Sequence, residues 1–303
     1  MRTLALTRSH AQLTELLKLG KPRVIALIVF CAVVGMLLAG PTLPAFSLIL
    51  AATAGIGLVA SGAAAFNCLI EVERDSNMRR TEQRPLVKGS VKPSDALIYA
   101  LLTTALGLWM LGAWVNMLTM WLTLATFFGY AVIYTRLLKG ATPQNIVIGG
   151  ASGAMPPILG WAAVTGSVPA EAMVLFLIIY TWTPPHFWAL AIYRRNDYAK
   201  AGLPMLPITH GLAFTRLSIL LYAAILAAVT ALPLAIGMSS WLYGISIVIL
   251  NTGFLSRAFK LWQEEKEAEG DLIARELFKY SIKYLAYLFA ALLLDHWLMV
   301  LLA

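Results

Sequence analysis

Nine long apolar runs restrict the possible fold of this chain more than any other feature. They cover residues 24–40, 46–66, 96–115, 118–135, 144–163, 171–192, 215–236, 240–256 and 281–302. Each is close to the length of about 20 residues that an α-helix needs to cross a bilayer. Charged residues make up only 13% of the chain, against about 25% in soluble domains. The sequence therefore predicts an all-α polytopic membrane protein, with nine transmembrane helices around a central cavity that opens at the cytoplasmic face.

Positive charges occur only in alternate links between these runs. All 23 lysine and arginine residues lie before residue 24 or in the links at 74–92, 136–139, 194–216 and 257–283. Because cytoplasmic links carry the excess of lysine and arginine, this pattern places the N-terminus in the cytoplasm and the C-terminus outside the cytoplasmic (inner) membrane. The net charge of +8 follows from this topology, so we expect no nucleic-acid partner.

The remaining sequence gives no sign of a second domain, and residues 1–303 are expected to form one transmembrane domain. Residues 1–23 are moderately basic and carry leucines on one side, which predicts a cytoplasmic interfacial segment. The two cysteines, Cys31 and Cys68, are too few for a disulfide framework. The link at 260–280 is rich in both charges and predicts a solvated helix.

A dense cluster of charges at residues 67–86 follows the second apolar run. In a continuous helix, Asn67, Glu71 and Asp75 would share one face at spacings of four residues. Three oxygen donors on one face suit Mg²⁺, which completes its shell with phosphate oxygens and water. The arginines of the cluster, among them Arg80 and Arg84, could then pair with phosphate oxygens. A solvated charged loop is the alternative, and the residues alone leave both interpretations open.

A second charged cluster follows the sixth apolar run on the same predicted side of the membrane. Asp197 is the only carboxylate of its link, and Arg194 and Lys200 flank it. These cations favour its ionised form, so the two clusters could hold the two ends of a Mg-diphosphate. Lys139, in a third cytoplasmic link, is a further candidate for a phosphate contact. The alternatives are a capped loop for Asp197 and, for Lys139, a helix-end lysine that extends to the interface.

His186 lies inside the sixth apolar run, after Pro184-Pro185 and between Trp182 and Trp188. Ionisable residues within membrane spans are candidates for function, and imidazole can ligate haem iron. A structural histidine hydrogen-bonded to a neighbouring carbonyl is the other interpretation.

Both clusters resemble motifs of the UbiA superfamily of intramembrane prenyltransferases. The first family motif is Asn-x-x-x-Asp-x-Asp-x-Asp-x-x-Met-x-Arg-Thr. Its positions are filled here by Asn67, Glu71, Glu73, Asp75, Met78, Arg80 and Thr81, so that glutamate stands at two of the aspartate positions. The second cluster is similar to the haem branch, with Pro185-His186, Asp197-Tyr198 and the run 201–207. Ala201 stands where the wider superfamily often has a second aspartate. Further matches are Lys21-Pro22-Arg23, Tyr134 with Lys139, and residues 152–157, so the resemblance covers nearly the whole chain.

The resemblance implies a Mg²⁺-dependent enzyme that transfers the farnesyl group of farnesyl diphosphate to a vinyl group of protohaem IX (haem B). Water then adds, giving haem O for cytochrome oxidase assembly. The implied metal ligands and catalytic residues are Asn67, Glu71, Asp75 and Asp197. The implied substrate-binding residues are Arg23, Arg80, Arg84, Lys139, Arg194 and Lys200, with His186 beside the haem. Expected partners are haem B, farnesyl diphosphate and the lipid bilayer, and a downstream haem A synthase or oxidase assembly factor is a further candidate.

Three other functions are alternatives for a chain with these features. A UbiA-type enzyme acting on an aromatic quinone precursor would share the diphosphate site, but His186 and Ala201 favour the haem branch. A transporter of an anionic metabolite would place charged or broken-helix sites near the bilayer midplane, whereas here the charges concentrate at one face. A non-catalytic partner in oxidase assembly would not need the acidic spacing at 67–75.

Overall fold

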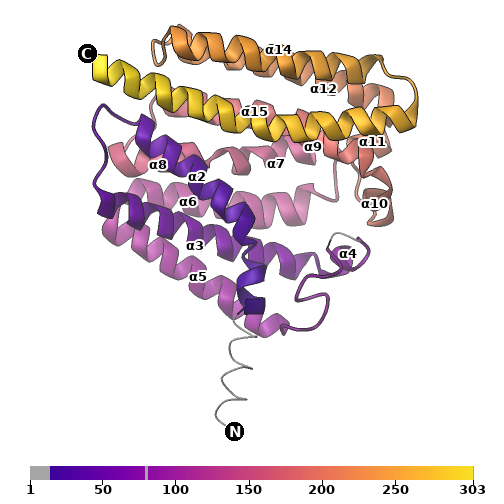
Figure 1. The fold of residues 1–303 in the computed structure, drawn as a ribbon. Coiled ribbons are helices and arrows are strands. Elements are labelled where there is room, and N and C mark those ends of the chain that lie inside the picture. The colour runs from indigo at the N-terminus through magenta and orange to yellow at the C-terminus, as the bar shows by residue number, and fades with distance from the viewer. Residues whose placement is uncertain (1–13, 79–80, 303) are drawn as a thin grey trace.

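The computed structural model describes residues 14–78 and 81–302, and this part of the chain consists of helices without any strand. Most of the helices run side by side along one bundle axis (Figure 1). In chain order they are α2 Pro22–Leu38, α3 Phe46–Ile70, α4 Val72–Ser76, α5 Pro93–Trp114, α6 Met117–Phe128, the π-helix η1 Gly129–Leu138, α7 Asn145–Ala154, α8 Pro156–Thr165, α9 Ala170–Tyr193, α10 Arg195–Lys200, α11 Leu206–Thr209, α12 Gly211–Val229, α13 Leu232–Ala235, α14 Trp241–Gln263 and α15 Glu267–Leu302. The all-α prediction is confirmed.

Each predicted span corresponds to a helical segment. Within the described residues, eight segments are long and apolar enough to cross a membrane: Phe46–Ile70, Pro93–Trp114, Met117–Leu138, Asn145–Thr165, Ala170–Tyr193, Gly211–Ala235, Trp241–Gln263 and Glu267–Leu302. The run at 24–40 forms α2, which has 17 residues and is therefore about 26 Å long. This is at the short limit for a spanning helix. Residues 14–19 of the predicted interfacial segment are helical, and residues 1–13 lie outside the described part.

Glycines allow two pairs of helices to approach closely. A Cβ atom at Gly62 of α3 would lie 2.1 Å from Thr104 Oγ1 of α5, and one at Gly107 of α5 would lie 2.7 Å from the Gly55 carbonyl oxygen. A Cβ at Gly35 of α2 would likewise lie 2.2 Å from the Pro157 carbonyl oxygen of α8. Close backbone approach through small residues is typical of membrane helices. Here it holds α5 against α3, the helix that ends at the charged residues 67–75.

Helix α9 is the most enclosed of the candidate spans, with 72% of its apolar window buried. It packs against α7, α12 and α15, and the helix continues through Pro184 and Pro185. Prolines cannot donate to the preceding turn. In the turns before them, the Thr181 and Thr183 hydroxyls donate to the Leu177 and Ile179 carbonyls at 2.8 and 2.7 Å.

Helix α15 has 36 residues and is about 54 Å long. It begins at the end of the bundle where α10 and α4 lie, and its C-terminus lies at the opposite end (Figure 1). Near that C-terminus, buried Asp295 accepts hydrogen bonds from the Ser240 and Tyr243 backbone N–H groups at 2.6 and 3.1 Å, at the start of α14. Asp295 therefore caps α14 at the end of the bundle opposite α4 and α10.

Candidate active site

Asn67, Glu71 and Asp75 come together at the end of α3, as their spacing predicts. The helix is interrupted at Glu71, where φ is −102° and ψ is 9°. The i to i+4 pattern nevertheless continues, since the Glu71 N–H donates to the Asn67 carbonyl at 3.1 Å and the Asp75 N–H to the Glu71 carbonyl at 2.8 Å. The Asn67 amide donates to Glu71 Oε2 at 2.9 Å. All three residues are at least 98% buried, which argues against a solvated loop. Glu73, between them, is exposed.

Each of these three residues holds a cation from another part of the chain. The Lys139 ammonium donates to Glu71 Oε1 at 2.5 Å, and the Arg84 guanidinium pairs with the Asp75 carboxylate. The Lys21 ammonium donates to Asn67 Oδ1 at 2.6 Å. Charges buried to this degree require partners. These three residues, whose side-chain oxygens could bind a metal ion, and the three cations paired with them are called the first cluster below.

A π-helix places one side of the first cluster. In η1 the Thr135 hydroxyl donates to the Tyr130 carbonyl at 2.8 Å, and the Lys139 N–H donates to the Tyr134 carbonyl at 2.9 Å, five residues back in both cases. Asn67 Nδ2 in turn lies 3.3 Å from Thr135 Oγ1. π-Helical turns are rare and often occur at functional sites. The wider turn brings Thr135 and Lys139 to α3, a contact that the sequence analysis missed.

Lys21, which was not among the predicted site residues, reaches Asn67, while the predicted role of Arg23 in substrate binding stays a prediction. Lys21 precedes Pro22, the first residue of α2, and is the one non-glycine residue with positive φ among the described residues, at φ 54°. Arg23 is exposed. Burial lowers the pKa of the Lys21 ammonium to about 8. Burial also lowers the pKa of Lys139, an effect that the neighbouring Glu71 carboxylate opposes.

The loop after α4 returns to the cluster through Thr81, whose hydroxyl donates to the Asp75 carbonyl at 2.9 Å. This turn brings Arg84 to Asp75. Arg80, predicted to contact phosphate, lies outside the described residues.

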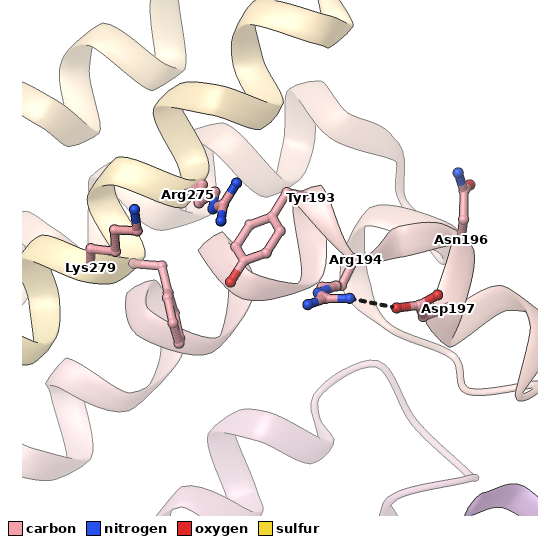
Figure 2. A pocket seen from close by; sticks show the side chains of 7 residues that line it. Tyr193, Arg194, Asn196, Asp197, Arg275 and Lys279 are labelled. Carbon is pink, nitrogen blue, oxygen red and sulfur yellow. Dashed lines mark hydrogen bonds and ion pairs between the residues drawn. The ribbon is translucent and has the colours of Figure 1, made fainter. Parts of the chain in front are cut away.

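The second cluster surrounds a cavity of about 540 Å³ between the end of α9, α10 and the first half of α15. Figure 2 shows the residues that line it, which are Tyr193, Arg194, Asn196, Asp197, Arg275, Phe278 and Lys279. Asp197 accepts a hydrogen bond from Arg194 at 3.1 Å. Lys200 is exposed and does not line this cavity. The sequence analysis did not identify the three residues from α15.

The two clusters lie at the same end of the bundle, on α4 and α10 (Figure 1). Within residues 14–78 and 81–302, no group of three or more His, Cys, Asp or Glu side chains is placed to hold a metal ion. Glu71, Asp75 and the Asn67 amide oxygen nevertheless form a donor set that fits a hard cation such as Mg²⁺, because all are oxygens and two are buried carboxylates. Participation of Asp197 in the same metal site remains a prediction.

His186 is buried within the bundle. Its Nδ1 lies 2.6 Å from the Ser281 hydroxyl. The imidazole stacks on Trp182 at 4.2 Å and on Phe278 at 4.6 Å between ring centroids. The hydrogen-bond partner is thus a hydroxyl rather than a carbonyl. Because Phe278 also lines the cavity, His186 lies directly behind the second cluster.

Comparisons with known proteins agree with this arrangement. The model of the UbiA prenyltransferase family matches residues 28–282. A protoheme IX farnesyltransferase from Methylibium petroleiphilum is 60% identical over 283 residues, which is 92% of this chain and 90% of the relative. Another protein of that name, from Aromatoleum aromaticum, is 59% identical over 98% of this chain and 97% of its own length.

Solved structures support the fold. A structure described as giving insights into digeranylgeranylglyceryl phosphate synthase in membranes has a TM-score of 0.80 at 17% identity, covering 95% of this chain and 99% of that one. A UbiA homolog from Archaeoglobus fulgidus bound to GPP and Mg²⁺ has a TM-score of 0.65 at 18% identity, covering 92% and 99%. From the family match and these identities, the chain belongs to the UbiA prenyltransferase family.

Proposed function

We propose that this protein transfers the farnesyl group of farnesyl diphosphate to a vinyl group of protohaem IX, with addition of water, to give haem O. The observation that carries the proposal is the buried first cluster, in which three oxygen donors are each matched with a cation. The activity named for relatives that are 59–60% identical over nearly the whole chain supports the choice of donor and acceptor. Membership of a prenyltransferase family argues against the transporter and the non-catalytic partner.

The first cluster suits a diphosphate because its cations can exchange partners. Lys21, Lys139 and Arg84 would donate charge-assisted hydrogen bonds to the diphosphate oxygens. Asn67, Glu71 and Asp75 would then be released to hold Mg²⁺, with Asp197 as a further ligand. Bound Mg²⁺ would neutralise the charge that develops on the leaving diphosphate.

The reaction breaks the bond between the allylic carbon and the diphosphate oxygen, and the electron pair leaves with the diphosphate. The allylic carbon then bonds to the terminal vinyl carbon of haem. Water attacks the cation formed next to the ring and loses a proton, which gives the hydroxyethylfarnesyl group. Water must not reach the allylic carbon first, because that would produce farnesol. Burial of the first cluster supports this exclusion.

We also propose that the protein lies in the cytoplasmic (inner) membrane with its N-terminus in the cytoplasm. The distribution of the 23 positive residues supports this orientation. So does the position of the C-terminus at the opposite end of the bundle from α4 and α10 (Figure 1).

Mass analysis of the haem product tests the activity. Purified full-length protein in detergent is incubated with haem B, farnesyl diphosphate and Mg²⁺, and the extracted haem is compared with that from an Asp75→Asn variant. We expect a mass increase equal to one farnesyl group plus one hydroxyl in the wild type alone. If the wild type leaves haem unmodified but prenylates an aromatic quinone precursor, the acceptor is the quinone precursor and not haem B.

A further inference from the structure

We propose that the cavity of the second cluster binds the two carboxylate groups of the porphyrin acceptor, with Arg275 and Lys279 of α15 as the recognising residues. The inference rests on the proposed function and adds a binding site for the acceptor. Arg275 and Lys279 are four residues apart and so lie on one face of α15. Both line the cavity of about 540 Å³ (Figure 2).

Neither cation makes an ion pair or a hydrogen bond within the described part of the chain, and Arg275 has an electrostatic interaction with Tyr193 of the cavity wall. Two carboxylates of α15 near the cavity are already engaged, because Arg195 donates to Asp271 at 2.5 Å and to Glu267 at 3.0 Å. Glu276, next to Arg275 in the chain, is exposed and does not line the cavity. Asp197, the one carboxylate that lines the cavity, is held by Arg194. The cavity therefore has a positive charge that the chain itself does not neutralise.

The walls of the cavity distinguish a porphyrin carboxylate from a diphosphate. Phe278 and Tyr193 line it beside the cations, with their ring centroids 6.0 Å apart. Aromatic rings and cations that line one cavity suit a flat apolar ring that carries anionic groups on one edge. The diphosphate has its own set of three cations in the first cluster, supplied by segments that do not line this cavity.

His186 gives a second, independent indication. It lies on α9 seven residues before Tyr193, about 10 Å along the helix axis. Its stacking partner, Phe278, borders the cavity. Protohaem IX carries its two carboxylates on one edge and its vinyl groups on the opposite edge. A ring held by Arg275 and Lys279 at its carboxylate edge would direct its vinyl groups away from these two cations.

The test compares haem B with its dimethyl ester, which keeps the ring, iron and vinyl groups but has no carboxylate charge. Binding of both is measured on full-length protein for the wild type, Arg275→Gln, Lys279→Gln and the double variant. Lys260→Gln is the matched control, since it removes one exposed cation of α14 that does not line the cavity.

We expect the wild type to bind haem B more tightly than the ester. Each single variant should lose about fivefold to tenfold in affinity for haem B, the effect of a charge-assisted hydrogen bond at an accessible site. The double variant should bind haem B and the ester equally, whereas Lys260→Gln should behave as the wild type. Affinity for farnesyl diphosphate should stay unchanged in all of them.

Two outcomes would overturn the inference. The first is a double variant that still discriminates haem B from its ester as the wild type does. The second is a double variant that loses farnesyl diphosphate affinity while haem binding stays intact. The second result would assign the cavity to the diphosphate.

Turnover of the same wild-type preparation separates this inference from the proposed function. A wild type that farnesylates haem, with double-variant KM for haem unchanged, refutes only the carboxylate site. A wild type that binds haem B through Arg275 and Lys279 but forms no farnesylated product refutes only the reaction.

Discussion

The Lys139 ammonium lies 2.5 Å from Glu71 Oε1, and both side chains are buried, 14% and 2% exposed. Loss of one member of a buried ion pair leaves the other charge unpaired, which costs about 3–5 kcal/mol. We therefore expect Lys139→Met to lower the melting temperature measured in chelator. Mg²⁺ should restore part of the loss, because it can take the place of the ammonium beside Glu71.

The double variant Glu71→Gln, Lys139→Met removes both charges and supplies the control. It should recover much of the stability lost by Lys139→Met and should remain inactive, since both groups are assigned to diphosphate and metal binding. Equal destabilisation of the single and double variants would show that packing, and not the unpaired charge, governs stability at this position.

Asp75 and Asp197 should both be required for turnover. We expect Asp75→Asn and Asp197→Asn to lower kcat by at least about 100-fold, the size expected when an electrostatic contact to a developing charge is removed. Glu82→Gln, which changes an exposed residue of the same loop, is the control and should retain normal activity. Near-normal turnover of Asp197→Asn in folded protein would remove the second cluster from the metal site.

Mg²⁺ and diphosphate should bind synergistically. Each oxygen donor of the first cluster holds a cation in the free protein, so Mg²⁺ alone would separate lysines and arginine from their partners. Diphosphate accepts those cations, and each ligand should therefore raise the affinity of the other by the same factor. Calorimetric titration of inorganic diphosphate with Mg²⁺ and with chelator should show at least a tenfold difference. Full enzymatic activity in chelator would mean that the three cations neutralise the leaving group unaided.

The pH dependence of diphosphate binding should follow Lys21. Its pKa is lowered to about 8 by burial, so the ammonium is present below this pH and is lost as the pH rises through it. KM for farnesyl diphosphate should therefore rise between pH 8 and 9. In Lys21→Arg the rise should be smaller, because a guanidinium remains charged there. Lys18→Arg, at an exposed position, should keep the wild-type profile, and an unchanged profile in Lys21→Arg would argue against a direct role of Lys21.

His186 should affect haem and not farnesyl diphosphate. We expect His186→Ala to shift the absorption spectrum of bound haem or weaken haem affinity, while KM for farnesyl diphosphate stays constant. Ser281→Ala is the companion variant, because it removes the hydroxyl that contacts Nδ1 at 2.6 Å and leaves the imidazole in place. A purely structural histidine would give lower melting temperatures in both variants with an unaltered haem spectrum.

The spans and the first cluster were predictable from the sequence because both depend on local periodicity. Apolar runs fix where helices cross, and the four-residue spacing of Asn67, Glu71 and Asp75 places them on one face even though the helix is interrupted at Glu71. The contact of Lys21 with Asn67 was not predictable, since it depends on the backbone conformation of one residue, the positive φ of Lys21 before Pro22. The π-helix around Thr135 has no distinct periodic signal in a short apolar segment. Arg275 and Lys279 belong to a link whose charges resemble any solvated helix, and only packing of α15 on α9 brings them to Tyr193.

The uninterrupted length of α15 also determines the surroundings of the second cluster in the membrane. Counting about 20 residues from its C-terminal end to cross the hydrocarbon layer reaches the region of Ile282. Arg275 and Lys279 would therefore lie at the level of the lipid headgroups, where anionic lipids attract lysine and arginine. Lipid phosphates would then compete with an incoming acceptor for the same two side chains, so the content of anionic lipid in the leaflet would set how readily the enzyme takes up its acceptor.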